Sequence, residues 1–387
     1  MAVYSLSEKL AQQIVDKTMQ IINCNVNIIN TKGQIIGSGN TERLGELHEG
    51  ALLALSRKEV VSIDEEGAKN LHGVRPGVNL PLQIDGEIVG VIGLTGEPTH
   101  LKQFGQLVCM SAQMMMEQAR LLHDLAQESR LREELVLNLI QAEELTPKLL
   151  EWGQRLGIDL TIPRVACIIE INIDIEHSEV ESAIYEFKGI QDHLYTQHIS
   201  DLYAVQSLTK MIVLIPALNQ HGHWDTAEHK TKLEKILAER KKSAAQLNMK
   251  MALGHYFTDE KNNIAKSYQT ANTTLLIGKQ RKPEEKYYQY HDLILPVLLD
   301  GLNSGWQALE FLYPLNQLKQ QDNNGLLLKT LRVWFKNNLQ MGATAKALYV
   351  HRNTLEYRLN KISSITGLRM DLLDDRLLLY IAVLLDK

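Results

Sequence analysis

The sequence predicts a multidomain α+β protein that ends in an all-helical domain. Two hairpin patterns alternate with helical patterns between Ser7 and Leu94, a strand-helix-strand-strand-helix-strand order follows in the middle, and helices alone occupy the C-terminal part. A chain of 387 residues has room for two or three domains, and its 44% hydrophobic and 22% charged residues are typical of a soluble protein.

Composition excludes several classes of protein. The net charge of -5 excludes a polycation that coats nucleic acid. Cys24, Cys109 and Cys167 are far apart and form neither a disulfide framework nor a zinc spacing, as in a reducing cytoplasm. Residues 1–10 lack the apolar core of a signal peptide, and the apolar run 377–385 is shorter than the roughly 20 residues that span a bilayer. We expect a soluble, cytoplasmic protein without a membrane partner.

The N-terminal patterns predict a small sensor domain of the PAS or Cache kind. Helices are expected at Ser7 to Ile22 and His48 to Leu55. One hairpin is expected from Val26 to Ile36, around the turn Thr31 to Gly33, and a second from Val78 to Leu94, where Asp85-Gly86 is a strong hairpin signal.

A glycine-punctuated loop after the first hairpin is the first candidate site. Glycines let backbone N–H groups converge on an anion, Arg43 can clamp a carboxylate through two parallel hydrogen bonds, and His48 can supply another donor. The alternative is that the glycines are turns and Arg43 is a solvated surface charge.

A second cluster precedes the second hairpin. Pro76 and Gly77 turn the chain and direct Arg75 and Asn79 toward the same cavity. Two separated donor clusters suit a ligand with a carboxylate at each end. The candidate ligand contacts are Gly37, Ser38, Gly39, Arg43, His48, Arg75, Gly77 and Asn79.

A long helix is expected from Gln106 to Ile140, a stretch without proline or glycine. Its apolar residues follow a seven-residue seam that becomes less regular toward the end: Leu107, Met110, Met114, Leu121, Leu125, Leu131, Leu135 and Leu139. The helix is interpreted as a dimer stalk that joins sensor to effector. A core helix with a methionine-rich side is the alternative.

The middle segment predicts a ferredoxin-like, nucleotide-cyclase-like domain. A helix from Pro147 to Leu156, stopped by Gly157, precedes it. Its strands and helices are expected at Arg164 to Ile173, Val180 to Thr196, Leu202 to Val205, Lys210 to Pro216, Ala227 to Leu247, Lys250 to His255 and Ile264 to Ile277.

The chemistry of a cyclase is missing from this segment. No Gly-Gly pair occurs in the chain, and the segment Gln206 to Thr209 between two strands holds no acid for a metal. His221, His223 and His229 lack a carboxylate or cysteine to complete a metal site. The domain is therefore expected to be degenerate, with no catalytic residue, no metal and no cofactor.

The C-terminal third is expected to be helical. Asn303 to Asn324 links it to the middle domain through helices interrupted by Pro314, and the polar break from Asp322 to Gly325 marks a boundary. A helix then runs from Leu326 to Asn338. The last helix runs from Met370 to Leu385, with Asp371, Asp374 and Asp375 in its first turn.

Residues 343–362 predict a helix-turn-helix. A short helix from Thr344 to Leu348 meets a turn at Tyr349 to His351, and the helix from Arg352 buries Leu355, Leu359 and Ile362. Arginine suits guanine O6 and N7, and asparagine suits adenine N6 and N7. The alternative is an amphipathic helix pair in a core. The candidate DNA contacts are Lys346, His351, Arg352, Asn353, Thr354, Glu356, Tyr357, Arg358, Asn360 and Lys361.

Positive charge gathers around this motif. Between Gly325 and Arg369 the cations face one acid, Glu356; they are Lys329, Arg332, Lys336, Lys346, Arg352, Arg358, Lys361 and Arg369. A basic segment on an acidic body confines phosphate attraction to the docking surface.

With these residues in place, the chain resembles the carbohydrate-diacid regulator family of bacterial transcription factors. The resemblance rests on IIGSGNTERLGELHEGAL (Ile35 to Leu52), GVRPGVNLPLQIDGEIVGVIGLTGEP (Gly73 to Pro98) and VHRNTLEYRLNKI (Val350 to Ile362). The segment Ala252 to Gly278 is similar to the degenerate cyclase-like domain of purine-catabolism-type regulators.

The resemblance implies a transcriptional activator for the uptake and breakdown of glucarate, galactarate and, as a further candidate, glycerate. Its partners would be operator DNA, a sugar diacid effector and a second copy of the chain, with RNA polymerase a candidate. The expected domains are sensor and linking helix 1–135, cyclase-like domain 145–280, helical connector 281–325 and helix-turn-helix domain 326–387. A cyclase with a regulatory head and a protein-binding scaffold remain as alternatives.

Overall fold

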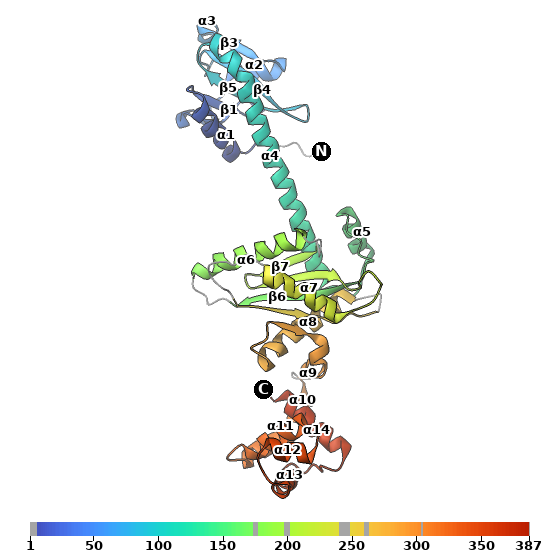
Figure 1. The fold of residues 1–387 in the computed structure, drawn as a ribbon. Coiled ribbons are helices and arrows are strands. Elements are labelled where there is room, and N and C mark those ends of the chain that lie inside the picture. Colours follow the sequence, from blue (N-terminus) through green and yellow to red (C-terminus); the bar gives the residue numbers. More distant parts are fainter. Residues whose placement is uncertain are drawn as a thin grey trace. The chain divides into compact units, whose positions relative to one another are not determined.

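A computed structural model describes residues 6–172, 177–196, 202–239, 248–258, 263–302 and 305–386 of the chain (Figure 1). The fold divides into two compact units, Met1–Ser129 and Arg130–Lys387. The first unit and the middle of the chain each contain a β-sheet, and the C-terminal region is helical, so the predicted multidomain α+β class is confirmed.

The first unit is built on an antiparallel five-stranded sheet with the strand order β2-β1-β5-β4-β3. Both predicted hairpins are confirmed, whereas β3 and α3 were not expected. The elements are α1 (Glu8–Ile21), β1 (Val26–Ile29), β2 (Ile35–Ser38), η1 (Thr41–Arg43), α2 (Glu49–Arg57), β3 (Val61–Ile63), α3 (Glu65–Lys69), β4 (Gly77–Ile84), β5 (Glu87–Thr95) and the start of α4 (Pro98–Leu139).

The two faces of this sheet are covered by different helices. Side chains alternate between faces along a strand, so Ile28 packs with the cluster that contains Ile14 of α1 and Val108 of α4. Ile29, its neighbour in β1, packs on the opposite face with Ala51 of α2. The face under α2 also carries the loop in which a ligand site was predicted.

Helix α4 begins earlier than predicted, at Pro98 rather than Gln106, because proline is tolerated in the first helical turn and Gly105 does not end the helix. Its predicted seam is largely uncovered: Leu107, Met110 and Met114 are 60%, 54% and 62% exposed. The alternative of a methionine-rich side in a core holds for another side of α4, where Met116 is buried and Met115 packs against the same core. Leu135 and Leu139, farther along, are buried in a core of the second unit.

The middle of the chain forms a second sheet with the order β10-β9-β6-β8-β7, whose last four strands follow the predicted ferredoxin-like arrangement. The short β10, parallel to β9, was not expected. The elements are α5 (Pro147–Arg155), β6 (Arg164–Asn172), α6 (His177–Thr196), β7 (Tyr203–Ser207), β8 (Lys210–Pro216), α7 (Thr226–Glu239), β9 (Asn248–Leu253), α8 (Asn263–Arg281) and β10 (Tyr287–Gln289).

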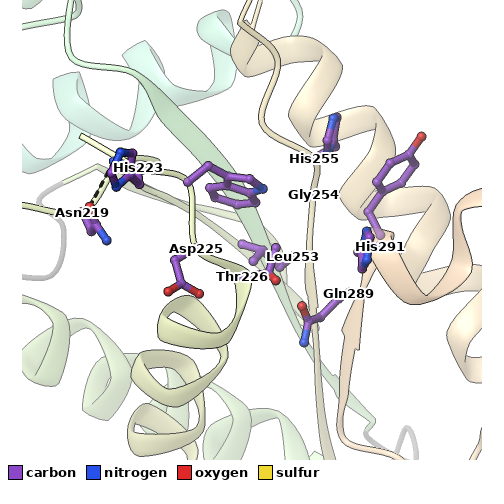
Figure 2. A pocket seen from close by; sticks show the side chains of 11 residues that line it. Asn219, His223, Asp225, Thr226, Leu253, Gly254, His255, Gln289 and His291 are labelled. Atoms are coloured by element: carbon purple, nitrogen blue, oxygen red, sulfur yellow. Dashed lines mark hydrogen bonds between the residues drawn. The ribbon is translucent and has the colours of Figure 1, made fainter. Parts of the chain in front are cut away.

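Parts of two predicted elements, Ile173 and residues 240–247, lie outside the described residues. The turn between β7 and β8 lies beside the C-terminal half of β6, where Glu170 pairs with Lys210. A pocket opens beside the other end of β6, where Gly254 N donates to Ala166 O at 2.9 Å (Figure 2).

The C-terminal region consists of η2 (Tyr290–Leu293), α9 (Ile294–Asp300), α10 (Trp306–Gln321), α11 (Leu326–Lys336), α12 (Met341–Ala347), α13 (Arg352–Thr366) and α14 (Leu373–Leu385). Pro314 was expected to interrupt a helix but lies within α10. The last helix begins at Leu373, so Asp371 precedes it. Within the described residues, no helix combines the length and the apolar character needed to cross a bilayer.

The structure gives Gly77 a packing role that alanine substitution tests. A Cβ at Gly77 would collide with the carbonyl oxygen of Leu94 in β5, whereas a Cβ at Gly105 in α4 would meet Leu80 at an ordinary 3.4 Å. Gly77→Ala should lower the local stability of the β4–β5 pair by about 1–3 kcal/mol. Gly105→Ala should raise the stability of α4 by up to about 1 kcal/mol. Hydrogen exchange of peptides from β4, β5 and α4 measures both, and equal protection in both variants would contradict the assignment.

Candidate ligand and nucleic-acid sites

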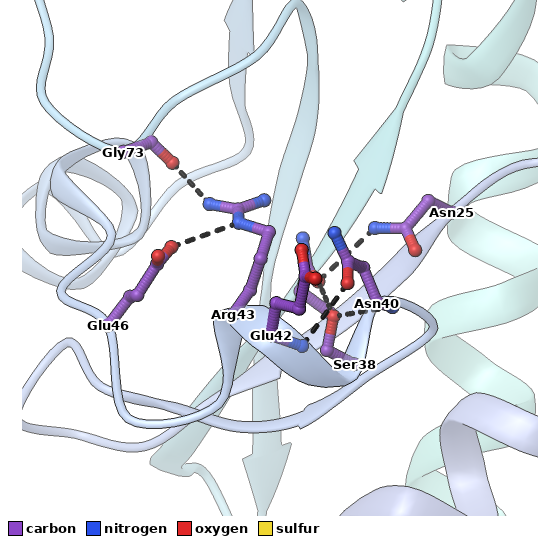
Figure 3. A network of polar contacts seen from close by, with 8 residues as sticks. Asn25, Ser38, Asn40, Glu42, Arg43, Glu46 and Gly73 are labelled. Atoms are coloured by element: carbon purple, nitrogen blue, oxygen red, sulfur yellow. Dashed lines mark hydrogen bonds and ion pairs between the residues drawn. The ribbon is translucent and has the colours of Figure 1, made fainter.

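A row of polar side chains crosses the sheet of the first unit on the face covered by α2. The register pairs Ser38 with Asn27, Asn27 with Gly93, and Gly93 with Asn79. Ser38, Asn27 and Asn79 are 1%, 1% and 3% exposed. Ser38 Oγ donates to Asn27 Oδ1 at 2.7 Å and accepts from Asn40 N at 3.0 Å (Figure 3). Because burying a polar group is costly without a hydrogen bond, this buried polar row is a candidate ligand site.

Asn79 holds an unused acceptor in this row. Its Oδ1 is buried and has no hydrogen-bond partner. Two glycines make room for its amide, since a Cβ on Gly50 would lie 3.0 Å from Asn79 Nδ2 and a Cβ on Gly93 would lie 3.1 Å from Asn79 Oδ1. An unsatisfied buried acceptor costs about 1–3 kcal/mol. A ligand that donates a hydrogen bond here would remove that cost.

His48 lies near the Nδ2 side of the Asn79 amide. It is the N-cap of α2, and its Nδ1 accepts from Ala51 N at 3.1 Å. Burial, and then the charge of Arg43, lower the pKa of His48 to about 4, so the ring is neutral near pH 7 and carries its proton on Nε2. His48 Cε1 would lie 3.2 Å from the same Gly50 Cβ, so His48 and Asn79 flank one glycine.

Arg43 is a buried cation rather than the solvated surface charge of the alternative interpretation, because it is only 7% exposed. Its Nε donates to Glu46 Oε2 at 3.2 Å, and its Nη2 donates to Gly73 O at 2.5 Å (Figure 3). The guanidinium thus joins the loop after β2 to the segment before β4. It also acts on His48 electrostatically, which brings two of the predicted residues into one cluster.

The predicted cradle of free backbone N–H groups is not formed. Ser38 N donates to Gln12 Oε1, and Gly39 N donates to Val26 O. Gly37 and Ser38 lie in β2 rather than in the loop, and a Cβ on Gly37 would lie 2.8 Å from the backbone carbon of Ala11 in α1. Gly37 therefore lets α1 approach the sheet.

The second predicted cluster is split. Gly77 is the first residue of β4, where it packs against β5, while Arg75 is exposed. Asn79 lies on the face of β4 that α2 covers. Sequence reasoning missed Asn27 and Gly93, although an asparagine inside the apolar run of β1 is the signal that could have found the first.

The helix-turn-helix forms as predicted. Helix α12 ends at Ala347, and Tyr349, with φ +54°, takes the left-handed conformation at the turn. His351 caps α13 by accepting from Asn353 N at 3.3 Å. Leu355 is completely buried in the core of the C-terminal helices, together with Leu359 and Ile362.

Most of the predicted DNA contacts lie on the exposed surface: Lys346, His351, Arg352, Asn353, Thr354, Glu356, Tyr357, Asn360 and Lys361. Arg358 is instead half-buried, and its Nη1 donates to Thr330 Oγ1 at 3.3 Å, so it fastens α13 to α11. Tyr349, which is 96% exposed, was not among the predicted DNA contacts.

Two cations elsewhere in the domain are already held in ion pairs. Arg332 pairs with Asp386, and Arg369 pairs with Asp371. In the part of the domain that is described, no ion pair involves Lys346, Arg352 or Lys361. These three cations are therefore available to phosphates and base edges.

Comparison with known domain families gives three matches that together cover most of the chain. Residues 6–139 match the family described as sugar diacid recognition. Residues 141–277 match the GGDEF-like domain, and residues 327–385 match the PucR C-terminal helix-turn-helix domain. The polar row and the exposed face of α13 lie in the first and last of these segments.

Two relatives are similar along nearly the whole chain, and a third is similar over a short segment. It is 57% identical over 387 residues to the carbohydrate diacid regulator of Escherichia coli, with 100% of both chains covered. It is 34% identical over 382 residues to an uncharacterized protein of Haemophilus influenzae, covering 98% of this chain and 99% of that one. The purine catabolism regulatory protein of Bacillus subtilis is 49% identical over 49 residues, 13% of this chain and 9% of that protein.

The environment of His48 predicts acid sensitivity of the first unit. Its pKa in the folded protein, about 4, is below the ordinary 6.5, so the unfolded chain binds the proton first as the pH falls. The stability contributed by the neutral ring is complete above about pH 6.5 and is lost as the pH falls toward 4, by up to about 3 kcal/mol. His48→Asn keeps a capping acceptor and removes the titration.

Hydrogen exchange of peptides from α2 and β4 at pH 7, 5.5 and 4.5, corrected for intrinsic rates, measures this effect. The native protein should lose more protection than His48→Asn across that window. The same loss in both proteins would show that the buried imidazole does not control it.

Proposed function

We propose that this chain, which belongs to the carbohydrate diacid regulator family and is a DNA-binding transcriptional regulator, binds sugar diacids and activates genes for their uptake and breakdown. Glucarate and galactarate are the proposed effectors, with glycerate as a further candidate. The observation that carries the effector assignment is the buried cluster of Arg43, His48 and Asn79, in the segment that matches sugar diacid recognition.

The chemistry of this cluster suits a hydroxylated diacid. A hydroxyl group both donates and accepts, so it can donate to Asn79 Oδ1 while accepting from His48 Nε2. Arg43 can exchange its bonds to Glu46 and Gly73 O for a carboxylate, which accepts two parallel bonds from a guanidinium. The exposed Arg75, before β4, is the proposed partner of the second carboxylate.

The effector would reopen a closed loop. In the structure the bonds of Arg43 hold the loop after β2 against Gly73, and His48 is buried below it. A ligand that takes over Arg43 changes these bonds only through its differential affinity for the two loop states. This loop is the proposed switch of the sensor domain.

A second copy of the chain is the proposed partner of helix α4. Leu107, Met114 and Leu121 recur every seven residues and are 60%, 62% and 64% exposed. A seam of that period buries itself in a parallel coiled coil, and a dimer presents two reading helices to a two-fold operator. RNA polymerase is the proposed further partner of the DNA-bound dimer.

The two alternative functions have less support. A cyclase needs metal-binding acids, and the turn between β7 and β8 instead holds Ser207 and Thr209, whose hydroxyl oxygens lie 3.2 Å apart. A scaffold would have no use for the exposed and unpaired cations Lys346, Arg352 and Lys361 of the helix-turn-helix. We propose that the middle domain is not a catalyst.

Calorimetric titration of the full chain with D-glucarate tests the effector site. Arg43→Gln keeps a polar side chain but loses the charge, and should weaken binding about 10–100-fold, as expected for a lost charged hydrogen bond. Arg57→Gln, on the exposed last turn of α2, is the matched control and should bind like the native protein. Absence of any glucarate or galactarate binding, or equal affinity in the two variants, would refute the site.

Titration of operator and random DNA tests the reading helix. Arg352→Ala removes an exposed side chain at the start of α13 and should relax base preference, costing roughly 1–3 kcal/mol at one position. Lys336→Ala, at the end of α11, should weaken binding to all sequences and flatten the salt dependence by about one unit. Equal losses on specific and random DNA for both variants would reverse this placement of α13.

A further inference from the structure

The middle domain contains a pocket that the proposed regulator function does not use. It has a volume of about 470 Å³, within the range of small-molecule sites. Three segments form it: the loop from Asn219 to Thr226, the end of β9 at Leu253 to His255, and the end of β10 at Gln289 to His291 (Figure 2). It lies beside the N-terminal end of β6, whereas the turn between β7 and β8 lies beside the other end of that strand.

The loop on one side of the pocket is preorganised by its own hydrogen bonds. Asn219 Oδ1 accepts from His221 N and His223 N, each at 3.0 Å, and Asn219 N donates to His223 O at 2.9 Å. Gly222, with φ +76°, allows the tight turn. The wall that carries Trp224 is thus held in place without a ligand, which reduces the entropy lost on binding.

Aromatic rings line both sides of the pocket. The Trp224 ring is fixed by packing on His229 and Tyr256, with ring centroids 4.8 Å and 5.8 Å apart. Across the pocket, His255 lies 4.9 Å from Tyr290, again between ring centroids. The face of an aromatic side chain can stack on a planar heterocycle, whichever base the heterocycle belongs to.

The charges of the lining exclude a phosphate as the main anchor. None of the described residues that line the pocket is a lysine or an arginine. The positive end of α7 is already used, because Asp225 Oδ1 accepts from Ala227 N at 2.9 Å and from Glu228 N at 3.1 Å. A phosphate would therefore meet one carboxylate and no permanent cation.

The polar groups of the lining can read the edge of a planar ring. Gln289 offers an amide that donates and accepts, and the imidazoles of His255 and His291 do the same (Figure 2). Glutamine pairs with the adjacent donor and acceptor of a purine through two hydrogen bonds. Burial and the neighbouring His291 lower the pKa of His255, which favours a neutral ring as hydrogen-bond partner.

We propose that this pocket binds a planar nitrogen heterocycle of the nucleobase class, as a free base or nucleoside, with Trp224 stacking on the ring and Gln289 reading its edge. The pocket is separate from the proposed sugar diacid cluster and from the turn between β7 and β8, where a cyclase would hold its metal-binding acids. It gives the regulator a second small-molecule input.

Calorimetry and saturation-transfer NMR of the full chain with adenosine, guanosine and cytidine test the proposal. At least one purine nucleoside should bind saturably, and Gln289→Ala and Trp224→Leu should each weaken it about tenfold or more. Gln206→Ala, at the end of the sheet beside the β7–β8 turn, should leave the affinity unchanged. Gln289→Ala keeps the test valid if Trp224→Leu does not fold.

Three outcomes would overturn the proposal. One is the absence of saturable binding by every nucleoside. Another is binding that Gln206→Ala abolishes and Gln289→Ala retains, which would place the ligand at the opposite end of the sheet. The third is a nucleoside triphosphate that binds far more tightly than its nucleoside, because the pocket would then recognise the phosphates. D-Glucarate binding is independent of all three.

Discussion

One uninterrupted helix supplies apolar side chains to two hydrophobic cores, and the rest of the molecule depends on it. In α4, Val108, Ala112 and Met116 belong to the core under the first sheet, while Leu135 and Leu139 belong to a core of the middle domain. Each large side chain buried this way contributes about 1.5–3 kcal/mol. The backbone hydrogen bonds of α4 therefore connect residues whose packing the sensor sheet controls to residues that support the middle domain. We propose that an effector response is passed along this continuous helix.

The proposed effector cluster and the proposed reading helix meet opposite physical requirements. The sensor domain buries Arg43, His48 and Asn79, and it leaves Asn79 Oδ1 without a partner, a cost that the proposed ligand would relieve. The C-terminal domain keeps Arg352 and Asn353 exposed and buries Leu355 behind them, because base edges have to be reached from the surface. A closed polar cluster in the first unit and an open basic surface on α13 would suit a ligand-controlled DNA reader.

Elements with a strong local pattern were predictable from the sequence, and tertiary roles were not. The β4–β5 hairpin follows from Asp85-Gly86, and α13 follows from the spacing of Leu355, Leu359 and Ile362. The role of Gly37 was predicted wrongly. Whether this glycine opens an anion site or lets α1 approach β2 depends on the position of a helix earlier in the chain. For the same reason the inward turn of Arg358 was missed, since Thr330 on α11 determines it. The burial of Arg43 was not predictable either, because the carbonyl oxygen that accepts from its guanidinium belongs to Gly73, 30 residues away.

We propose that binding of a sugar diacid to the sensor domain and binding of operator DNA to α13 are coupled through one chain. Thermodynamic linkage makes such coupling reciprocal, with typical energies of about 1–3 kcal/mol. The direct measurement is the affinity of the full-length protein for its operator with and without saturating D-glucarate, together with its affinity for D-glucarate with and without operator. Both affinities should change by the same factor, at least about fivefold. Operator affinity that is the same with and without bound diacid would contradict the account.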